Sequence, residues 1–299
     1  MVTHMTNIDF LKTESRNPKT LNLDTMSTLT LLRIMNEEDQ KVIGAIKEAL
    51  PQIEKSIQLT IEALRNNGRI IYIGAGTSGR LGILDAVECV PTFSTNDEVI
   101  GLIAGGEKAF VRAVEGAEDS EALAVEDLKK VNVNENDAVV AIAASGRTPY
   151  AIGALKYAKE INAKCIGISC NKASELSKYA DVAIEVDAGP EILTGSTRLK
   201  AGTSQKLILN MISTASMVGI GKVYGNLMVD MRATNQKLVE RAKRIVMEST
   251  GCDMTVALKT LEISEFSIKE AIVMILTGVT REEAKQKIIQ NKGFIRKCI

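Results

Sequence analysis

The chain has 299 residues, which is enough for a large buried core, and its 37 basic and 37 acidic residues cancel at pH 7. This balance, together with 3% aromatic residues and no Trp, argues against nucleic acid or an acidic membrane as a partner. No apolar run reaches the ~18–20 residues that span a bilayer, and no signal-peptide pattern opens the chain, so we expect a cytoplasmic protein.

The N-terminal part of the chain combines a polar arm with helical patterns. We interpret residues 1–22 as a solvated arm, although its segment Thr13–Pro18 is dense in hydrogen-bonding groups. Apolar residues recur at helical spacing over 29–35 and 42–64, and Pro51 is expected to begin a new helix or to kink one.

From residue 70 onward, strand and helix patterns alternate. Apolar runs predict strands at 70–73, 99–104, 137–143, 164–169 and 182–186. Helical patterns follow these runs at 80–88, 108–114, 121–130, 150–161 and 203–219. We expect Pro91 to end the first of these helices. The alternation predicts an α/β fold, a doubly wound parallel sheet with helices on both faces.

After about residue 240 the strand signals stop. Three short helical patterns follow, at 253–263, 266–277 and 280–290, and the last opens with Thr280-x-x-Glu283, a capping box. We therefore divide the chain into an N-terminal arm with helices (1–50), a ligand-binding α/β domain (51–240) and a small C-terminal helical module (241–299).

Residue usage limits the chemistry that this chain can perform. The five cysteines include no Cys-x-x-Cys pair, which predicts reduced thiols rather than a disulfide framework or a zinc site. The single histidine, His4, argues against a Ser-His-Asp triad and against a His-rich metal site. Glu, Asp, Lys and Ser must then carry any catalysis, and we expect no metal or cofactor.

The turn after the first strand, Gly74-x-Gly76-x-x-Gly79, matches the dinucleotide-binding fingerprint. That fingerprint also requires an acidic residue where the second strand ends, but this strand ends in Ala104-Gly105-Gly106. No Gly-Lys-Ser/Thr sequence is present, which excludes a Walker A loop. Glycines and hydroxyls that lead into a helix nevertheless favour an anion, most often phosphate.

The same kind of turn recurs along the chain. Ser78-Gly79-Arg80 and Ser145-Gly146-Arg147 each follow an apolar strand and precede a helix, and 194–198 (TGSTR) is a third hydroxyl-rich loop. In an open parallel sheet such loops converge at the carboxyl ends of the strands. Each loop taken alone is also compatible with an ordinary tight turn. Three together predict a site for the phosphate monoester of a small molecule.

Long blocks of the chain resemble the N-acetylmuramic acid 6-phosphate etherase family, which belongs to the sugar isomerase (SIS) superfamily and is related to the glucokinase regulatory protein. The resemblance runs from Thr13–Pro18 to Gly293–Arg296, nearly the whole chain. The blocks are IYIGAGTSGRLGILDAVECVPTF, GLIAGGEKAFVRAVEGAEDS, VVAIAASGRTPYAIGAL, GISCN, TGSTRLKAGTSQKLILNMIST and KVYGNLMVDMRATN. The resemblance implies a SIS-type fold.

It also implies cleavage of the D-lactyl ether of N-acetylmuramic acid 6-phosphate to N-acetylglucosamine 6-phosphate and D-lactate, in the recycling of cell-wall amino sugars. The family eliminates lactate from the open-chain sugar and then adds water. The family's acidic pair falls on Glu88 and Glu118, and we assign Glu88 as the acid and Glu118 as the base, although either order is chemically reasonable. Read without the resemblance, Glu88 is a solvated carboxylate at a helix end and Glu118 is a helix cap.

The resemblance further implies which residues contact the phosphosugar. They are Thr77, Ser78, Gly79, Ser145, Gly146, Thr148, Ser196 and Lys200. The basic residues Arg80, Arg147, Arg198 and Lys200 are candidates for the phosphate or the lactyl carboxylate, or else are surface residues in salt bridges. Glu115 and Asp119 are the nearest competitors of Glu118 for the role of base.

Along a helix over 80–88, Glu88 lies ~12 Å from Arg80, a distance that a hexose phosphate does not easily span. We therefore expect a homodimer whose site combines residues of two subunits. Two alternatives remain open from the sequence. One is an aldose–ketose phosphosugar isomerase, which also moves a proton at C2, and the other is a non-catalytic sugar-phosphate sensor.

Overall fold

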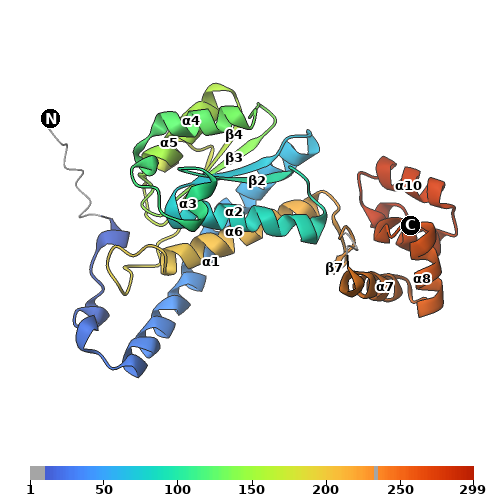
Figure 1. Ribbon diagram of the computed structural model, residues 1–299, viewed down its shortest axis with the longest axis horizontal. Helices are drawn as coiled ribbons and strands as arrows, with labels where there is room; N and C mark the ends of the chain where they lie inside the picture. Colours follow the sequence, from blue (N-terminus) through green and yellow to red (C-terminus); the bar gives the residue numbers. More distant parts are fainter. Residues whose placement is uncertain (1–10, 232–234) are drawn as a thin grey trace. The chain divides into compact units, whose positions relative to one another are not determined.

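Figure 1 shows the computed structural model of the chain, which describes residues 11–231 and 235–299. His4 lies outside the described residues. The chain divides into two compact units. The first comprises the chain up to Ala86 together with Glu98–Ile212, and the second comprises Val87–Asp97 together with Ser213–Ile299.

The first unit is built on a five-stranded sheet with the strand order β2-β1-β3-β4-β5, in which all neighbouring strands are parallel. The strands are β1 (Ile70–Gly74), β2 (Val99–Ile103), β3 (Ala138–Ala143), β4 (Lys164–Ser169) and β5 (Val182–Glu185). Helices lie on both faces of the sheet (Figure 1). The predicted doubly wound α/β fold is therefore confirmed.

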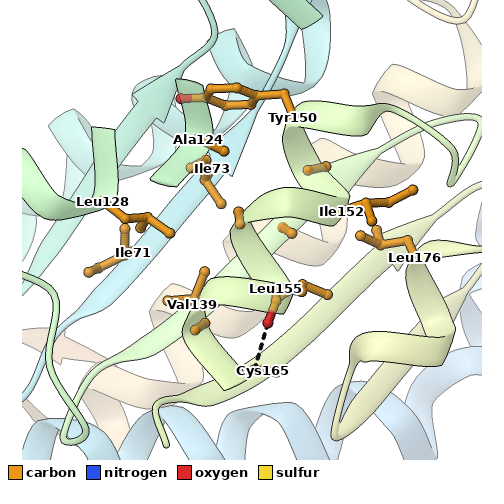
Figure 2. Close-up of a cluster of buried hydrophobic side chains, with 14 of the residues drawn as sticks. Ile71, Ile73, Ala124, Leu128, Val139, Tyr150, Ile152, Leu155, Cys165 and Leu176 are labelled. Atoms are coloured by element: carbon orange, nitrogen blue, oxygen red, sulfur yellow. Dashed lines mark hydrogen bonds between the residues drawn. The ribbon is translucent and has the colours of Figure 1, made fainter. Parts of the chain in front are cut away.

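One face of the sheet shares its core with α4 (Glu121–Lys130) and α5 (Pro149–Glu160). Ile71 of β1 and Val139 of β3 belong to this core, and the residues that alternate with them face the other way. Figure 2 shows both side chains in one cluster with Leu155 of α5. All three are fully buried, which fixes α5, and with it the loop that precedes this helix.

The opposite face is covered by α1 (Thr28–Arg65), α2 (Gly76–Phe93) and α6 (Lys200–Gly219) (Figure 1). The start of α2 approaches β1 very closely, because a Cβ added to Gly82 would lie 2.9 Å from Cβ of Tyr72. This close packing holds the first turn of α2 against the carboxyl end of β1.

Two of these helices run past the prolines at which the sequence predicts a break or an end. α1 is a single helix of 38 residues through Pro51, so a new helix beginning there is wrong. Its buried stripe, which includes Ile46 and Ile53 on either side of Pro51, outweighs the one lost hydrogen bond. α2 begins at Gly76 and continues past Pro91 to Phe93, so the end expected at Pro91 comes two residues later.

Shorter helices connect these elements. The α-helix α3 spans Glu107–Val111, so the helix expected over 108–114 ends earlier than predicted. The 3₁₀ helices are η1 (Lys12–Glu14), η2 (Pro18–Thr20), η3 (Leu23–Thr25), η4 (Ala117–Asp119), η5 (Leu176–Tyr179) and η6 (Ile295–Lys297). None of the helices formed by residues 11–231 and 235–299 is both long and apolar enough to cross a membrane.

The second unit is helical apart from one short hairpin. Its helices are α7 (Gln236–Thr250), α8 (Met254–Ile263), α9 (Ile268–Thr277) and α10 (Arg281–Gln290), and its hairpin is β6 (Val223–Tyr224) with β7 (Leu227–Met228). The last three helices and the capping box of Thr280 and Glu283 confirm the sequence prediction. The sequence prediction missed α7 and the hairpin.

Candidate active site

The strand order marks one place in the sheet where a ligand is expected. β1 lies between β2 and β3, so the chain proceeds from β1 toward one edge of the sheet and then returns to build the other side. In open α/β sheets, the crevice outside the carboxyl ends of the strands at such a switch point is the usual binding site. Gly74 pairs in register with Ile142, so the loops after β1 and β3 leave the sheet side by side.

A pocket of about 470 Å³ lies at this switch point, within the first unit. It is formed by the loops after β1 and β3, the N-terminal arm, η4 and the loop before α6. Its lining residues are Leu11, Glu14, Ala75, Gly76, Thr77, Ser78, Glu118, Asp119, Ala144, Ser145, Arg147, Thr148, Pro149 and Thr197. We refer to it as the main pocket.

The loop after β1 brings a helix N-terminus to the main pocket. α2 begins at Gly76, and the first N–H groups of a helix have no acceptor within it, so the turn presents donors and a positive dipole end. Thr77 and Ser78 line the pocket, and Ser78 Oγ donates to Gln205 Oε1 at 3.0 Å. Gly79 lies behind them, where an added Cβ would be 2.6 Å from the carbonyl oxygen of Gly74. No larger residue permits this tight turn.

The loop after β3 repeats this arrangement. Ser145 and Thr148 line the main pocket, and Thr148 is the N-cap residue of α5. Among the described residues, no backbone N–H of α5 donates to the Thr148 hydroxyl, so this hydroxyl is not used as a cap. Gly146 has φ +68°, and an added Cβ would lie 2.3 Å from Cβ of Ser174. The glycine is therefore essential to this turn.

The N-terminal arm forms a wall of the main pocket, so its interpretation as solvated is wrong for the residues around Thr13. Asn171, which follows β4, accepts through Oδ1 from the backbone N–H of Lys12 at 2.8 Å. Its Nδ2 donates to Thr13 Oγ1 and to the carbonyl oxygen of Ala144, both at 3.1 Å. One buried amide thus links the arm to the loop after β3 and holds Glu14 at the pocket.

A buried ion pair holds the arm to the start of α6. Glu38 of α1 accepts from Lys200 Nζ at 2.8 Å and from Asn17 Nδ2 at 3.1 Å. Burial would raise the pKa of Glu38, but the hydrogen bonds and charges of Lys200 and Lys41 outweigh it and lower the pKa to about 2. Lys200 Nζ also donates to the carbonyl oxygen of Ala188 at 3.0 Å. Its ammonium is therefore engaged away from the pocket.

The structure brings together most of the site residues that the sequence predicts. Thr77, Ser78, Ser145, Thr148 and Glu118 all line the main pocket, with Gly79 and Gly146 shaping its loops. Neither Lys200 nor Ser196 is among the described residues that line the main pocket, and Thr197 lines it instead. Glu88 belongs to the second unit, and its side chain is exposed on α2.

Sequence reasoning missed Glu14 and Thr197 as pocket residues. For Glu14 a signal was present, because Thr13–Pro18 is dense in hydrogen-bonding groups. For Thr197 the TGSTR loop was identified, but not the residue in it that reaches the pocket. Among the described residues, no group of three or more His, Cys, Asp or Glu side chains is arranged to hold a metal ion.

Comparisons with known proteins agree with this architecture. The family model of the glucokinase regulatory protein N-terminal SIS domain matches residues 52–159, and that of the SIS domain matches residues 117–215. A Bacillus cereus (strain G9842) protein named N-acetylmuramic acid 6-phosphate etherase is 59% identical over 293 residues, which cover 98% of this chain and 100% of the relative.

Two further matches are of different strength. A Bacillus anthracis (strain CDC 684 / NRRL 3495) protein of the same name is 58% identical, again over 98% of this chain and 100% of the relative. A solved phosphoheptose isomerase from Francisella tularensis is 18% identical with a TM-score of 0.48, covering 64% of this chain and 98% of that one.

Proposed function

The chain belongs to the family of N-acetylmuramic acid 6-phosphate etherases, and we propose that it cleaves the D-lactyl ether of N-acetylmuramic acid 6-phosphate. The products are N-acetylglucosamine 6-phosphate and D-lactate. The observation that carries this proposal is the 59% identity with a relative of that name over 98% of the chain. We assign the reaction to the cytoplasm, in the recycling of cell-wall amino sugars.

The main pocket suits the phosphate of this substrate. Hydroxyls of Thr77, Ser78, Ser145 and Thr148 converge there beside the N-termini of α2 and α5. Backbone N–H groups at a helix N-terminus, together with the helix dipole, stabilise a bound phosphate. The phosphate therefore lies between the loops after β1 and β3, and the sugar extends from it toward η4.

The proposed reaction needs one base at C2 and one acid at the C3 oxygen. Glu118, which lines the main pocket, removes the C2 proton of the open-chain sugar. The C3–O bond then breaks, and the leaving lactate oxygen takes a proton from the acid, Glu88. Water adds to C3 of the unsaturated aldehyde, and C2 regains a proton. Carboxyl groups suffice for every proton transfer in this sequence.

We propose that Glu88 acts in the pocket of a second subunit. Its exposed side chain supports this reading. Leu84 and Val87 on the same helix are large apolar side chains that are also exposed, as expected for a surface that a second copy covers. The active form is then a homodimer.

Incubation with N-acetylmuramic acid 6-phosphate and an assay for D-lactate test the activity. We expect release of D-lactate, and folded protein that releases none refutes the proposal. Glu118→Gln keeps the shape of the side chain but removes the base, so we expect kcat to fall by roughly 10²–10⁴-fold. A kcat that is unchanged in this variant contradicts the role of Glu118.

Subunit mixing tests the shared site. Homodimers of Glu88→Gln and of Glu118→Gln are each expected to be inactive. After subunit exchange, a mixed dimer holds one site with both wild-type carboxylates if the site is shared, so activity returns. If each site uses two carboxylates of one chain, the mixture stays inactive.

A further inference from the structure

A second, smaller pocket adjoins the main pocket. It has a volume of about 260 Å³ and shares Ala75, Gly76 and Glu118 with the main pocket. Its other lining residues are Arg80, Ala104, Ala109, Ala113, Val114, Glu115 and Gly116. We call it the side pocket. Because Glu118 lines both pockets, one carboxylate stands at the border between them.

The side pocket combines small apolar side chains with one cation. Ala104, Ala109 and Ala113 leave its centre open, and Arg80 is the only basic residue among its lining residues within the described chain. Both carboxylates of the lining, Glu115 and Glu118, are exposed, so water screens their charges. This lining suits a short group that carries both a methyl and a negative charge.

The guanidinium of Arg80 is held in place with donors to spare. Its Nε donates to the carbonyl oxygen of Phe110 at 2.9 Å, and its Nη2 donates to that of Ala109 at 2.8 Å. A guanidinium has five N–H donors, so three remain after these two bonds. The two carbonyls fix the orientation of the group, which lowers the entropy lost when it binds a carboxylate in bidentate geometry.

We propose that the side pocket binds the lactyl group of the substrate, with Arg80 on the lactyl carboxylate and the alanines around the methyl group. This inference rests on the proposed function. In this arrangement the phosphate lies at the loops after β1 and β3, and C2 of the sugar lies at Glu118. C3 is bonded to C2, so the ether oxygen on C3 also lies next to Glu118, at the border of the two pockets. The lactyl group that it carries then enters the side pocket.

Charge gives a second reason for this assignment. The main pocket holds one cation, Arg147, beside the carboxylates Glu14, Glu118 and Asp119, and the proposed phosphate already uses that cation, so a lactyl carboxylate placed there meets three carboxylates and a phosphate. Arg80 offers that carboxylate the only cation of the side pocket among the described residues. The 2-acetamido group, the other substituent near Glu118, is neutral, so it gains no charge–charge attraction from Arg80.

The test compares two ligands that differ only in the lactyl group. The KM for N-acetylmuramic acid 6-phosphate is measured by D-lactate release, and N-acetylglucosamine 6-phosphate is measured as a competitive inhibitor. In Arg80→Gln we expect the KM to rise by roughly 10- to 100-fold while the inhibition constant stays within about twofold. Arg112→Gln, an exposed arginine nearby that does not line the side pocket, is the matched control and is expected to change neither.

Arg80→Gln also removes the hydrogen bonds from Arg80 to the carbonyl oxygens of Phe110 and Ala109, so a second variant that keeps Arg80 is needed. Ala113→Leu narrows the side pocket and retains Arg80, and it is also expected to raise the KM and to leave the inhibition constant unchanged. If either folded variant weakens both ligands equally, the side pocket binds the acetamido group or serves only the fold, and the inference is wrong. If wild-type protein releases no D-lactate, the proposed function itself fails.

Discussion

Replacing Glu38 by Gln perturbs the buried ion pair that joins the N-terminal arm to α6. The side chains of Glu38 and Lys200 are 0% and 2% exposed, and their charged atoms lie 2.8 Å apart. Lys41 also approaches the same carboxylate, at 2.6 Å, but its side chain is 50% exposed. Lys19 lies 3.6 Å from this carboxylate and is 47% exposed, so Glu38 has one buried partner and two solvated ones, which allows a matched comparison.

The expected magnitudes follow from this difference in burial. Glu38→Gln leaves the Lys200 ammonium buried without its ion-pair partner, and we expect a loss of roughly 3–5 kcal/mol in the free energy of unfolding. Lys200→Met leaves Glu38 with Lys41 and Lys19 as partners, so the loss is smaller, roughly 2–3 kcal/mol. Lys41→Met removes only one solvated partner and costs less than about 1 kcal/mol.

The pH dependence provides an independent check. The pKa of Glu38 is about 2 in the folded protein, below the 4.5 of a glutamate without these partners. A pKa lowered by folding stabilises the protein fully above the unfolded value and loses this effect as pH falls through the folded value. The difference in stability between wild type and Glu38→Gln therefore shrinks as the pH falls from about 4.5 toward 2.

Urea denaturation followed by circular dichroism measures these differences at pH 7 and pH 3. Equal losses in Glu38→Gln and Lys41→Met would refute the reasoning from burial. If the difference in unfolding free energy between wild type and Glu38→Gln is the same at both pH values, the stabilisation does not come from the charged Glu38 carboxylate, and the reasoning is wrong. The double variant Glu38→Leu with Lys200→Met removes both charges, and we expect it to be more stable than Glu38→Gln.

Three further substitutions test other parts of the structure. Asn171→Ala removes the amide that links Thr13 to the loop after β3, so we expect a loss of roughly 2–4 kcal/mol by urea denaturation and a higher KM. Gly146→Ala places a Cβ 2.3 Å from Cβ of Ser174, at a residue whose φ is +68°. We expect calorimetry to detect at least tenfold weaker binding of N-acetylglucosamine 6-phosphate. An unchanged affinity contradicts the argument that this turn requires glycine. Thr280→Ala breaks the capping box and is expected to cost about 1 kcal/mol without changing the KM.

The sequence predicted the fold well where the signal is local. Each buried strand is a short apolar run, and the capping box of Thr280 needs only residues within one helical turn. A new helix starting at Pro51 and a helix end at Pro91 are wrong for the opposite reason. A local rule places a break at proline, but the packing of residues on both sides of Pro51 decides whether the helix continues, and that packing is not local.

The candidate site was predictable in its loops but not in its walls. Ser78 and Ser145 follow strands that the sequence identifies, and parallel strands bring their loops together. Glu14 reaches the pocket because the arm is bound to Asn171, 159 residues away from Lys12 in the chain. Lys200 shows the converse: a lysine beside a hydroxyl-rich loop is a reasonable phosphate ligand until its burial against Glu38 is known.

The main pocket, which we propose as the phosphate site, carries little formal positive charge. Each helix N-terminus carries the equivalent of roughly half an elementary charge, so α2 and α5 together supply about one. Arg147 lines the same pocket and adds a full charge, while Lys200 is committed to Glu38. Neutral donors and helix dipoles bind a phosphate without a cluster of lysines and arginines. Such a cluster would attract the lactyl carboxylate as well, so its absence from the lining residues that the structure describes helps to orient a substrate with two anionic ends.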